Sequence, residues 1–341
     1  MTLECSESSR PVEVPQTRTC GCAEPPKRIC DLCYSARSVF LACSRVCLER
    51  HQREQHAAEN GDAEARARTA ARAYNRQFPD SWQRYAQHRQ RVMALIGSLP
   101  PDAEICVFGA GNCSDLDLDM LACSQREIHL VDLDGDALER SRERQSRAVR
   151  DKIVLHPNVD FSGLLQHLDD WGERFPDRSA LGRSAVSAAQ RILRELGRSF
   201  AGVVSTCVLS QLAVPFQHAW VSSRANWADL LSALSAVHLA TLAGSTRSGG
   251  RGLLVFDVAS SKDTPELAQY GERPSGELPE LVAGSLARGA LTLRPRPKDL
   301  LSLLSSPGLR PLVSEAELGA PWLWDLGDAT QLVYSLSFVH P

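Results

Sequence analysis

The sequence predicts an α/β fold: a doubly wound, mostly parallel sheet of seven strands, preceded by a small cysteine-rich module and a helical connector. From residue 100 onward, short apolar runs alternate with stretches of helical periodicity, which is typical of a parallel sheet covered on both faces. The last run alternates apolar and polar residues, so we expect an antiparallel strand at or near an edge. The expected strands are residues 104–108, 127–131, 153–155, 202–205, 252–256, 312–313 and 330–338.

Helical patterns separate these strands. Four helices are expected inside the sheet region, and their ranges are residues 116–123, 137–150, 185–197 and 227–242. Residues 48–77 are rich in Ala, Arg, Glu and Gln, which favours helix. A further helix is expected over residues 81–98, where an apolar face follows a start signal at Pro79-Asp80-Ser81.

The chain of 341 residues is long enough for one large domain and a small module. We expect four parts. Residues 1–19 read as a flexible tail, residues 20–56 as a zinc-finger-like module, residues 57–99 as the helical connector, and residues 100–341 as the catalytic-type domain.

The composition limits which partners and which cellular location we expect for this protein. Hydrophobic residues make up 43% of the chain and the net charge is −3, which gives no electrostatic case for a membrane or a nucleic acid as partner. The Arg-rich stretch 140–152 interleaves acids with its cations and is interpreted as a solvated helix face. No apolar run reaches the length of a membrane span, and residues 1–19 lack a signal-peptide core. We therefore expect a cytoplasmic protein.

A glycine turn follows the first expected strand. Gly109 and Gly111 permit a tight turn and close backbone approach to a ligand, and the turn is expected to open a helix whose N-terminus favours electron-rich groups. Asp132 ends the second strand, 21 residues beyond Gly111, where an acid can accept both ribose hydroxyls. The alternative is a surface aspartate that starts a turn.

The two segments that carry these residues resemble a known family. Residues 107–116 (VFGAGNCSDL) and residues 129–138 (HLVDLDGDAL) are similar to motifs I and II of class I S-adenosylmethionine-dependent methyltransferases. The resemblance extends more loosely over residues 104–341 and implies a Rossmann-like sheet with a late strand pair. It also implies a cofactor site made of Gly109, Ala110, Gly111, Asp132, Leu133, Asp160 and Ser205.

Each of these residues has an implied role. The Gly109–Gly111 turn would line the methionine and ribose side, Asp132 would bind the ribose, and Leu133 would pack on the adenine. Asp160 would accept from the adenine amino group, although a helix N-cap or a turn residue is an equally good interpretation. Ser205 opens the stretch that faces the methyl group in this family.

The sequence departs from the family pattern at two positions. Val107 stands where the family often has an acid, and Cys113 replaces the third glycine. Asp115 and Asp117 are the candidates to replace the missing acid. No catalytic residue is identified: His238, Cys207 and Asp257 each have a structural interpretation that is at least as good as a chemical one. In the family a leading helix often lies across the cofactor cleft, so the resemblance makes Trp82, Tyr85, His88 and Arg89 candidates for substrate contact, with packing and surface positions as the favoured alternative.

Soft metal ligands cluster near the N-terminus. Residues 41–56 resemble the second half of a MYND or treble-clef zinc finger, and Cys30-x2-Cys33 has knuckle spacing. Eight ligands match two tetrahedral zinc sites, and the alternatives are one Zn²⁺ on four cysteines or a set of reduced thiols. The predicted ligands are Cys20, Cys22, Cys30, Cys33, Cys43, Cys47, His51 and His56. Such a closed site is structural, and we expect the module to recruit a protein partner or the substrate.

Together these patterns predict S-adenosylmethionine-dependent methyl transfer to a small-molecule or protein acceptor. Two alternatives stay open. The first is a zinc-finger adaptor whose nucleotide-binding domain is inactive. The second is a dinucleotide-dependent oxidoreductase, against which the lack of a full GxGxxG and the late strand pair both argue.

Overall fold

The computed structural model describes residues 16–19, 28–29, 38–42, 63–77, 82–219, 226–271 and 275–341. The chain divides into two compact units, residues 1–61 and residues 62–341. The first unit contains a three-stranded sheet in the order β1-β3-β2, in which β1 is parallel and β2 antiparallel to β3. Its strands are β1 (Gln16–Thr19), β2 (Arg28–Ile29) and β3 (Ser38–Ala42).

The second unit is built on an eight-stranded sheet, and this confirms the α/β fold with its mostly parallel sheet. The path is β10-β11-β8-β7-β4-β5-β6, and β9 also pairs with β11. Strands β8, β7, β4, β5 and β6 are mutually parallel. Their bounds are β4 (Glu104–Phe108), β5 (Glu127–Asp132), β6 (Ile153–Pro157), β7 (Phe200–Thr206), β8 (Thr246–Ser260), β9 (Ser314–Leu318), β10 (Trp322–Asp325) and β11 (Thr330–Val339).

The late strand pair is present but is divided differently from the prediction. β11 is antiparallel to β8, and it has both β9 and β10 as antiparallel partners on its other side. The strand predicted at residues 312–313 is wrong, because a 3₁₀ turn, Arg310–Leu312, precedes β9. The outer strand is thus made of two short pieces, which brings the strand count to eight instead of seven.

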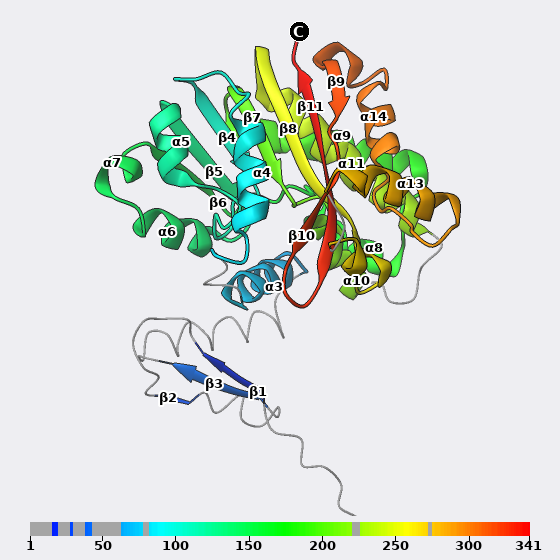
Figure 1. The fold of residues 1–341 in the computed structure, drawn as a ribbon, viewed down its shortest axis with the longest axis horizontal. Coiled ribbons are helices and arrows are strands. Elements are labelled where there is room, and N and C mark those ends of the chain that lie inside the picture. The colour runs from blue at the N-terminus through cyan, green and yellow to red at the C-terminus, as the bar shows by residue number, and fades with distance from the viewer. Residues whose placement is uncertain are drawn as a thin grey trace, which may run out of the picture. The chain divides into compact units, whose positions relative to one another are not determined.

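Helices cover both faces of the sheet (Figure 1). Their bounds are α3 (Ala63–Gln77), α4 (Ala86–Ile96), α5 (Leu118–Ser124), α6 (Gly135–Glu143), α7 (Arg147–Arg150), α8 (Leu168–Glu173), α9 (Arg178–Leu196), α10 (Val214–Ala219), α11 (Trp227–Ser245), α12 (Glu266–Tyr270), α13 (Leu278–Ala287) and α14 (Pro297–Leu304). The helix predicted over residues 137–150 is two helices, α6 and α7. Ser146 precedes α7 and caps it, since its hydroxyl accepts the Val149 N–H.

Alternation along the central strand divides the core in two. On β4, Ile105 and Val107 belong to the cluster that includes buried residues of α4, α5 and α6. Cys106 and Phe108 face the other cluster, with α9 and α11. Successive strand residues point to opposite faces, so a nearly unbroken apolar strand serves two cores. The carboxyl ends of the parallel strands are thereby fixed between two packed layers.

One described helix is long and apolar enough to cross a membrane by length and composition, namely the 19-residue α11. It packs against α9, β7 and β8. Leu230, Leu234 and Leu242 on it are buried in the larger core cluster. Burial inside the domain therefore accounts for its apolar composition.

Candidate functional site

A cavity of about 460 Å³ lies at the carboxyl ends of the parallel strands. Its walls come from α3, from the loops that follow β4, β5, β6 and β7, and from β8, β10 and β11. Ligands of open parallel sheets bind at this edge, and the volume is in the range of small-molecule and cofactor sites. Six of the seven predicted cofactor residues line it: Gly109, Ala110, Gly111, Asp132, Leu133 and Asp160.

The turn after β4 uses left-handed backbone at three positions, Gly109 (φ 69°), Gly111 (φ 47°) and Cys113 (φ 55°). A Cβ at Gly109 would lie 1.7 Å from Cγ2 of Val208, so only glycine fits there. Cys113, which the sequence resemblance aligned with a glycine, adopts a backbone conformation that favours glycine. The turn therefore has left-handed backbone at Cys113 although the residue there is not glycine.

The sequence predicted that the turn opens directly into a helix, and the structure shows that it does not. α5 begins only at Leu118, and its first turn is capped by the Asp117 carboxylate, which accepts from the Met120 N–H. A carboxylate already occupies the end of the helix where an anion would bind. The turn therefore offers backbone groups to a ligand without a free helix N-terminus.

Asp132 connects this turn to the end of β5. Its Oδ2 accepts the Gly111 N–H at 2.9 Å, and its Oδ1 accepts the Asp134 N–H at 2.7 Å. Burial raises the pKa of Asp132 from 3.8 to about 6, with the Asp134 charge adding to the rise and the backbone N–H bonds opposing it. The carboxylate is thus held in one orientation at the cavity wall, each oxygen retaining a lone pair.

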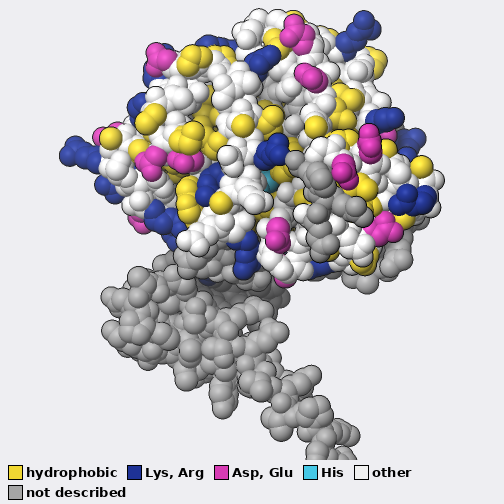
Figure 2. Space-filling view, viewed as in Figure 1, with side chains coloured by type: hydrophobic (Ala, Val, Ile, Leu, Met, Phe, Trp, Pro, Cys, Tyr) yellow, Lys and Arg dark blue, Asp and Glu magenta, His cyan; other side chains and the backbone are white. Residues whose placement is uncertain are grey.

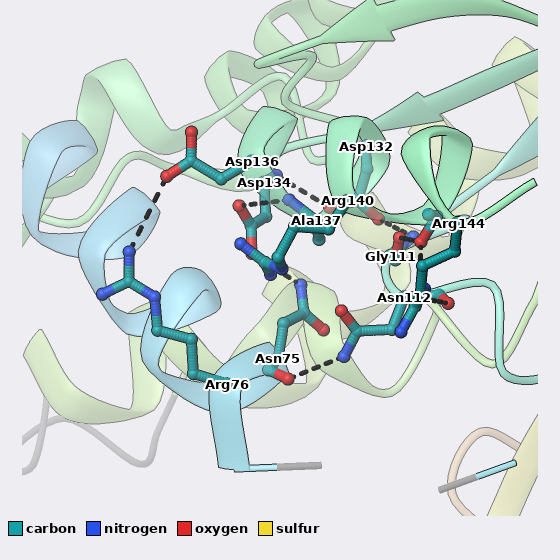
Figure 3. A network of polar contacts seen from close by, with 11 residues as sticks. Asn75, Arg76, Gly111, Asn112, Asp132, Asp134, Asp136, Ala137, Arg140 and Arg144 are labelled. Atoms are coloured by element: carbon teal, nitrogen blue, oxygen red, sulfur yellow. Dashed lines mark hydrogen bonds and ion pairs between the residues drawn. The ribbon is translucent and has the colours of Figure 1, made fainter. Parts of the chain in front are cut away.

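A polar network ties α3 to this edge (Figure 3). Nδ2 of Asn75 donates to Oδ2 of Asp134 at 3.0 Å, and the Asn75 carbonyl accepts from Nδ2 of Asn112 at 2.6 Å. Asp134 is fully buried and also caps α6 by accepting the Ala137 N–H. Because Asp134 bonds to Asp132 through its N–H, the position of α3 is coupled to that of the site carboxylate.

Asp160 lines the cavity and at the same time closes its own loop. Oδ1 accepts from the N–H and the hydroxyl of Ser162, and Oδ2 accepts from the Leu165 N–H at 3.2 Å. Burial raises the pKa of Asp160, and these bonds oppose the rise. Asp160 is therefore a turn residue and not a helix N-cap, since Leu164 precedes the next 3₁₀ helix, and the adenine contact stays a prediction.

The structure does not bring Ser205 to the cavity. Its side chain is fully buried, and its hydroxyl pairs with Nε2 of His238 at 2.7 Å, beneath the sheet. Burial lowers the pKa of His238 to about 4, as expected for a core imidazole. The last strand residue, Thr206, and the following Cys207 line the cavity instead. The prediction misplaced the contact because β7 extends one residue beyond its expected end.

Two carboxylates and two aromatic rings form the other end of the cavity. Asp115 follows the glycine turn and Asp257 lies on β8, while Tyr85 precedes α4 and Trp324 lies on β10. Burial raises the pKa of Asp115 to about 7, with Arg89 opposing the rise and the Asp257 charge adding to it. The Asp115 Oδ1 atom is buried and has no hydrogen-bond partner. Such a buried group is costly unless a ligand satisfies it.

His88 lies behind these residues. Its Nε2 atom is 3.9 Å from Sγ of Cys207 and 3.9 Å from Oδ1 of Asp115, and Nδ1 accepts from the indole N–H of Trp322. Burial lowers the pKa of His88 to about 3 and raises the pKa of the Cys207 thiol. The pair is therefore neutral, and a nucleophilic thiolate–imidazolium couple is not formed.

Sequence reasoning missed the contribution of α3, which we expected to be part of a helical connector. Ala67, Ala70 and Ala71 line the cavity together with Asn75 at the end of the helix. These positions follow the spacing i, i+3, i+4 and i+8, so they share one helical face. A face of alanines on an otherwise charged helix was the available signal.

The predicted metal ligands lie outside the described residues: Cys20, Cys22, Cys30, Cys33, Cys43, Cys47, His51 and His56. Within the part of the chain that the structure describes, no group of three or more His, Cys, Asp or Glu side chains could hold a metal ion. The zinc prediction therefore stays a prediction from spacing.

The charge of the cavity is one-sided. Of the described residues that line it, Asp115, Asp132, Asp160 and Asp257 are acidic, and none is a Lys or Arg. By contrast, basic and acidic side chains are interspersed over the surface of the same domain (Figure 2). A cavity with these walls favours a cationic ligand over an anionic one.

No protein-family model matches the chain, and no curated protein matches it. Solved structures with a similar arrangement include a SAM-dependent methyltransferase from Anabaena variabilis ATCC 29413, with 12% identity, a TM-score of 0.41, and coverage of 80% of this chain and 95% of that one. Another is the glycopeptide N-methyltransferase MtfA complexed with sinefungin, with 13% identity, a TM-score of 0.36, and coverage of 74% and 93%. Likenesses this weak establish neither family nor activity.

Proposed function

We propose that residues 62–341 form an S-adenosylmethionine-dependent methyltransferase. The observation that carries the proposal is the position of Asp132: its carboxylate lines the cavity, held between the N–H groups of Gly111 and Asp134. The remaining lone pairs of its two oxygens can accept two neighbouring hydroxyls, as a ribose presents them.

The residues present fit this cofactor better than they fit a dinucleotide. S-Adenosylmethionine carries a sulfonium and an ammonium against one carboxylate, and the cavity wall supplies carboxylates without Lys or Arg among the described lining residues. A dinucleotide brings a pyrophosphate, which needs a free helix N-terminus or a cation. Asp117 already caps α5, so that helix end is occupied by a carboxylate. The oxidoreductase alternative is disfavoured on both counts.

Each part of the wall has a role in this account. Asp132 orients the ribose, the left-handed turn at Gly109–Gly111 allows close backbone contact, and the alanine face of α3 excludes water. The bound cofactor supplies a methyl group activated by its attachment to a positive sulfur. The protein's contribution is alignment of donor and acceptor in a desolvated cavity.

Thermal unfolding with and without S-adenosylhomocysteine tests the proposal. A ligand that binds only the folded protein raises its stability by about 2.7 kcal/mol at one hundred times Kd. We expect the ligand to raise the unfolding midpoint of the wild-type protein, and the Asp132→Ala variant to show a smaller shift. No shift at saturating concentration would favour the second candidate, an inactive zinc-finger adaptor.

We further propose that residues 20–56 bind structural Zn²⁺ and recruit a protein partner or the substrate. The support is the ligand spacing in the sequence, above all Cys30-x2-Cys33 and the Cys43, Cys47, His51 series. Metal analysis of the purified full chain tests this. One or two equivalents of zinc are expected, and Cys30→Ser should lower the content.

A further inference from the structure

The end of the cavity beyond the nucleotide carries a distinct set of side chains, which we call the acceptor wall: Tyr85, Asp115, Asp257 and Trp324. The sheet order brings them together. β8, β11 and β10 are neighbours, and Asp257 pairs with Val333, which pairs in turn with Trp322. β8 lies three strand spacings from β5, so Asp257 and Asp132 are separated by about 14 Å at a spacing of about 4.8 Å. That distance leaves room for a second molecule beside a cofactor held at Asp132.

The charges of the cavity do not balance with the cofactor alone. The carboxylate of Asp160 is bonded within its own loop, and Asp132 is committed to the ribose. Asp115 and Asp257 remain. The Arg89 guanidinium, which does not line the cavity, is shared between Asp117 and Asp115. S-Adenosylmethionine brings one net positive charge. These two cations face three carboxylates, Asp115, Asp117 and Asp257, so one carboxylate is left to a second cation.

The polar contacts of the two carboxylates support this count. Oδ1 of Asp257 accepts from the hydroxyl of Ser210 at 2.7 Å, while the buried Oδ1 atom of Asp115 has no hydrogen-bond partner. Burial raises the pKa of both carboxyls, which disfavours their ionised forms in the empty cavity, and a cation bound beside them would favour ionisation again. A ligand that donates N–H groups would satisfy the unpartnered oxygen.

Two aromatic rings complete the wall. The rings of Tyr85 and Trp324 meet edge to face, with centroids 4.7 Å apart. His88 stacks on Trp324 at 4.1 Å, at an angle of 16°, and holds the indole from behind. Both lining rings are at most 9% exposed, which limits access to a small ligand. Aromatic faces beside carboxylates are a preferred surrounding for an ammonium group.

We propose that the acceptor wall binds a small-molecule amine in its cationic form, and that this amine is the methyl acceptor. The inference rests on the proposed function for the transfer step, whereas the binding of the amine stands on the wall itself. A neutral alcohol or a carboxylic acid of the same shape lacks the positive charge that Asp115 and Asp257 call for.

The transfer step then has a defined proton balance. The bound ammonium gives one proton to the Asp115 carboxylate, and the freed nitrogen lone pair bonds to the methyl carbon. The electron pair of the breaking C–S bond stays on sulfur, which becomes a neutral thioether. Asp115 is suited to this because burial raises its pKa to about 7, close to the working pH of a general base.

Calorimetric titration with matched probes tests the proposal. The full chain, saturated with S-adenosylhomocysteine, is titrated at pH 7.5 with benzylamine, benzyl alcohol and benzoate. We expect benzylamine to bind at least about tenfold tighter than benzyl alcohol, the usual worth of a charged hydrogen bond, and benzoate not to bind. Equal affinities for amine and alcohol, or tighter binding of benzoate, would overturn the proposal on wild-type protein alone.

Variants then locate the effect. Asp257→Asn and Asp115→Asn should each weaken benzylamine about tenfold and leave benzyl alcohol within about twofold. The exposed Asp263→Asn serves as the matched control and should change neither. Unchanged benzylamine affinity in both site variants would refute the role of the wall. If S-adenosylhomocysteine fails to bind while benzylamine still binds selectively to the free protein, the proposed function fails and the amine site stands.

Discussion

The carboxylate of Asp132 offers the sharpest test of how the site holds its cofactor. Replacing it with alanine removes the acceptor for the Gly111 N–H at 2.9 Å and the Asp134 N–H at 2.7 Å, together with the proposed ribose contacts. Hydrogen bonds to a charged group contribute about 1.5–3 kcal/mol each. If the ribose contacts amount to one such bond in net effect, Kd should rise about ten- to 150-fold.

Calorimetric titration with S-adenosylhomocysteine measures this change directly. Asp132→Asn keeps the shape and one acceptor oxygen, so its affinity should lie between those of the wild type and Asp132→Ala. Asp263→Ala, at an exposed position outside the cavity wall, is the control and should bind as the wild type does. A folded Asp132→Ala variant with unchanged affinity would refute the ribose role.

Three further predictions follow from the same contacts. Burial raises the pKa of Asp132 to about 6, so its ionised fraction falls about tenfold from pH 7 to pH 5, and the affinity for the cofactor should fall at least as much. If the affinity does not change between pH 7 and pH 5, the carboxylate is not the form that binds the cofactor. Gly109→Ala should lower the free energy of unfolding by about 2–5 kcal/mol, because the new Cβ clashes with Val208 and the backbone has a positive φ. Gly289→Ala, where φ is nearly the same but the space is open, should cost about 1–2 kcal/mol. Equal losses of the two variants in chemical denaturation would contradict the geometry. Asn75→Ala removes the bond to Asp134 and should increase hydrogen exchange in α3 but not in α9, with a few-fold weaker cofactor binding; unchanged exchange in α3 would show that the bond does not hold the helix.

Patterns of short range predicted the sheet and the nucleotide end of the site. The turn at Gly109 and Gly111 and the acid at Asp132 are close in sequence, joined by one strand and one helix, so their spacing already fixes their meeting point. The late strand pair was also expected, because the alternation of residues 330–338 differs from the apolar runs of the parallel strands.

Tyr85 and Asp257 were candidates for the site from the sequence, but their meeting with Asp115 and Trp324 in the acceptor wall could not be predicted in the same way. Tyr85 and Trp324 meet although 239 positions separate them, because β10 is placed by its pairing with β11 and α4 packs on β10. No local period carries that information. The error at Ser205 is local: a shift of one residue along β7 turns a side chain from the cavity to the core.

The most direct test of the central claim is a pair of calorimetric titrations of the wild-type full chain, one with S-adenosylmethionine and one with NAD⁺. The carboxylate-lined cavity and the capped end of α5 predict saturable binding of S-adenosylmethionine and no binding of NAD⁺. Binding of NAD⁺ without S-adenosylmethionine, or binding of neither, would contradict the account.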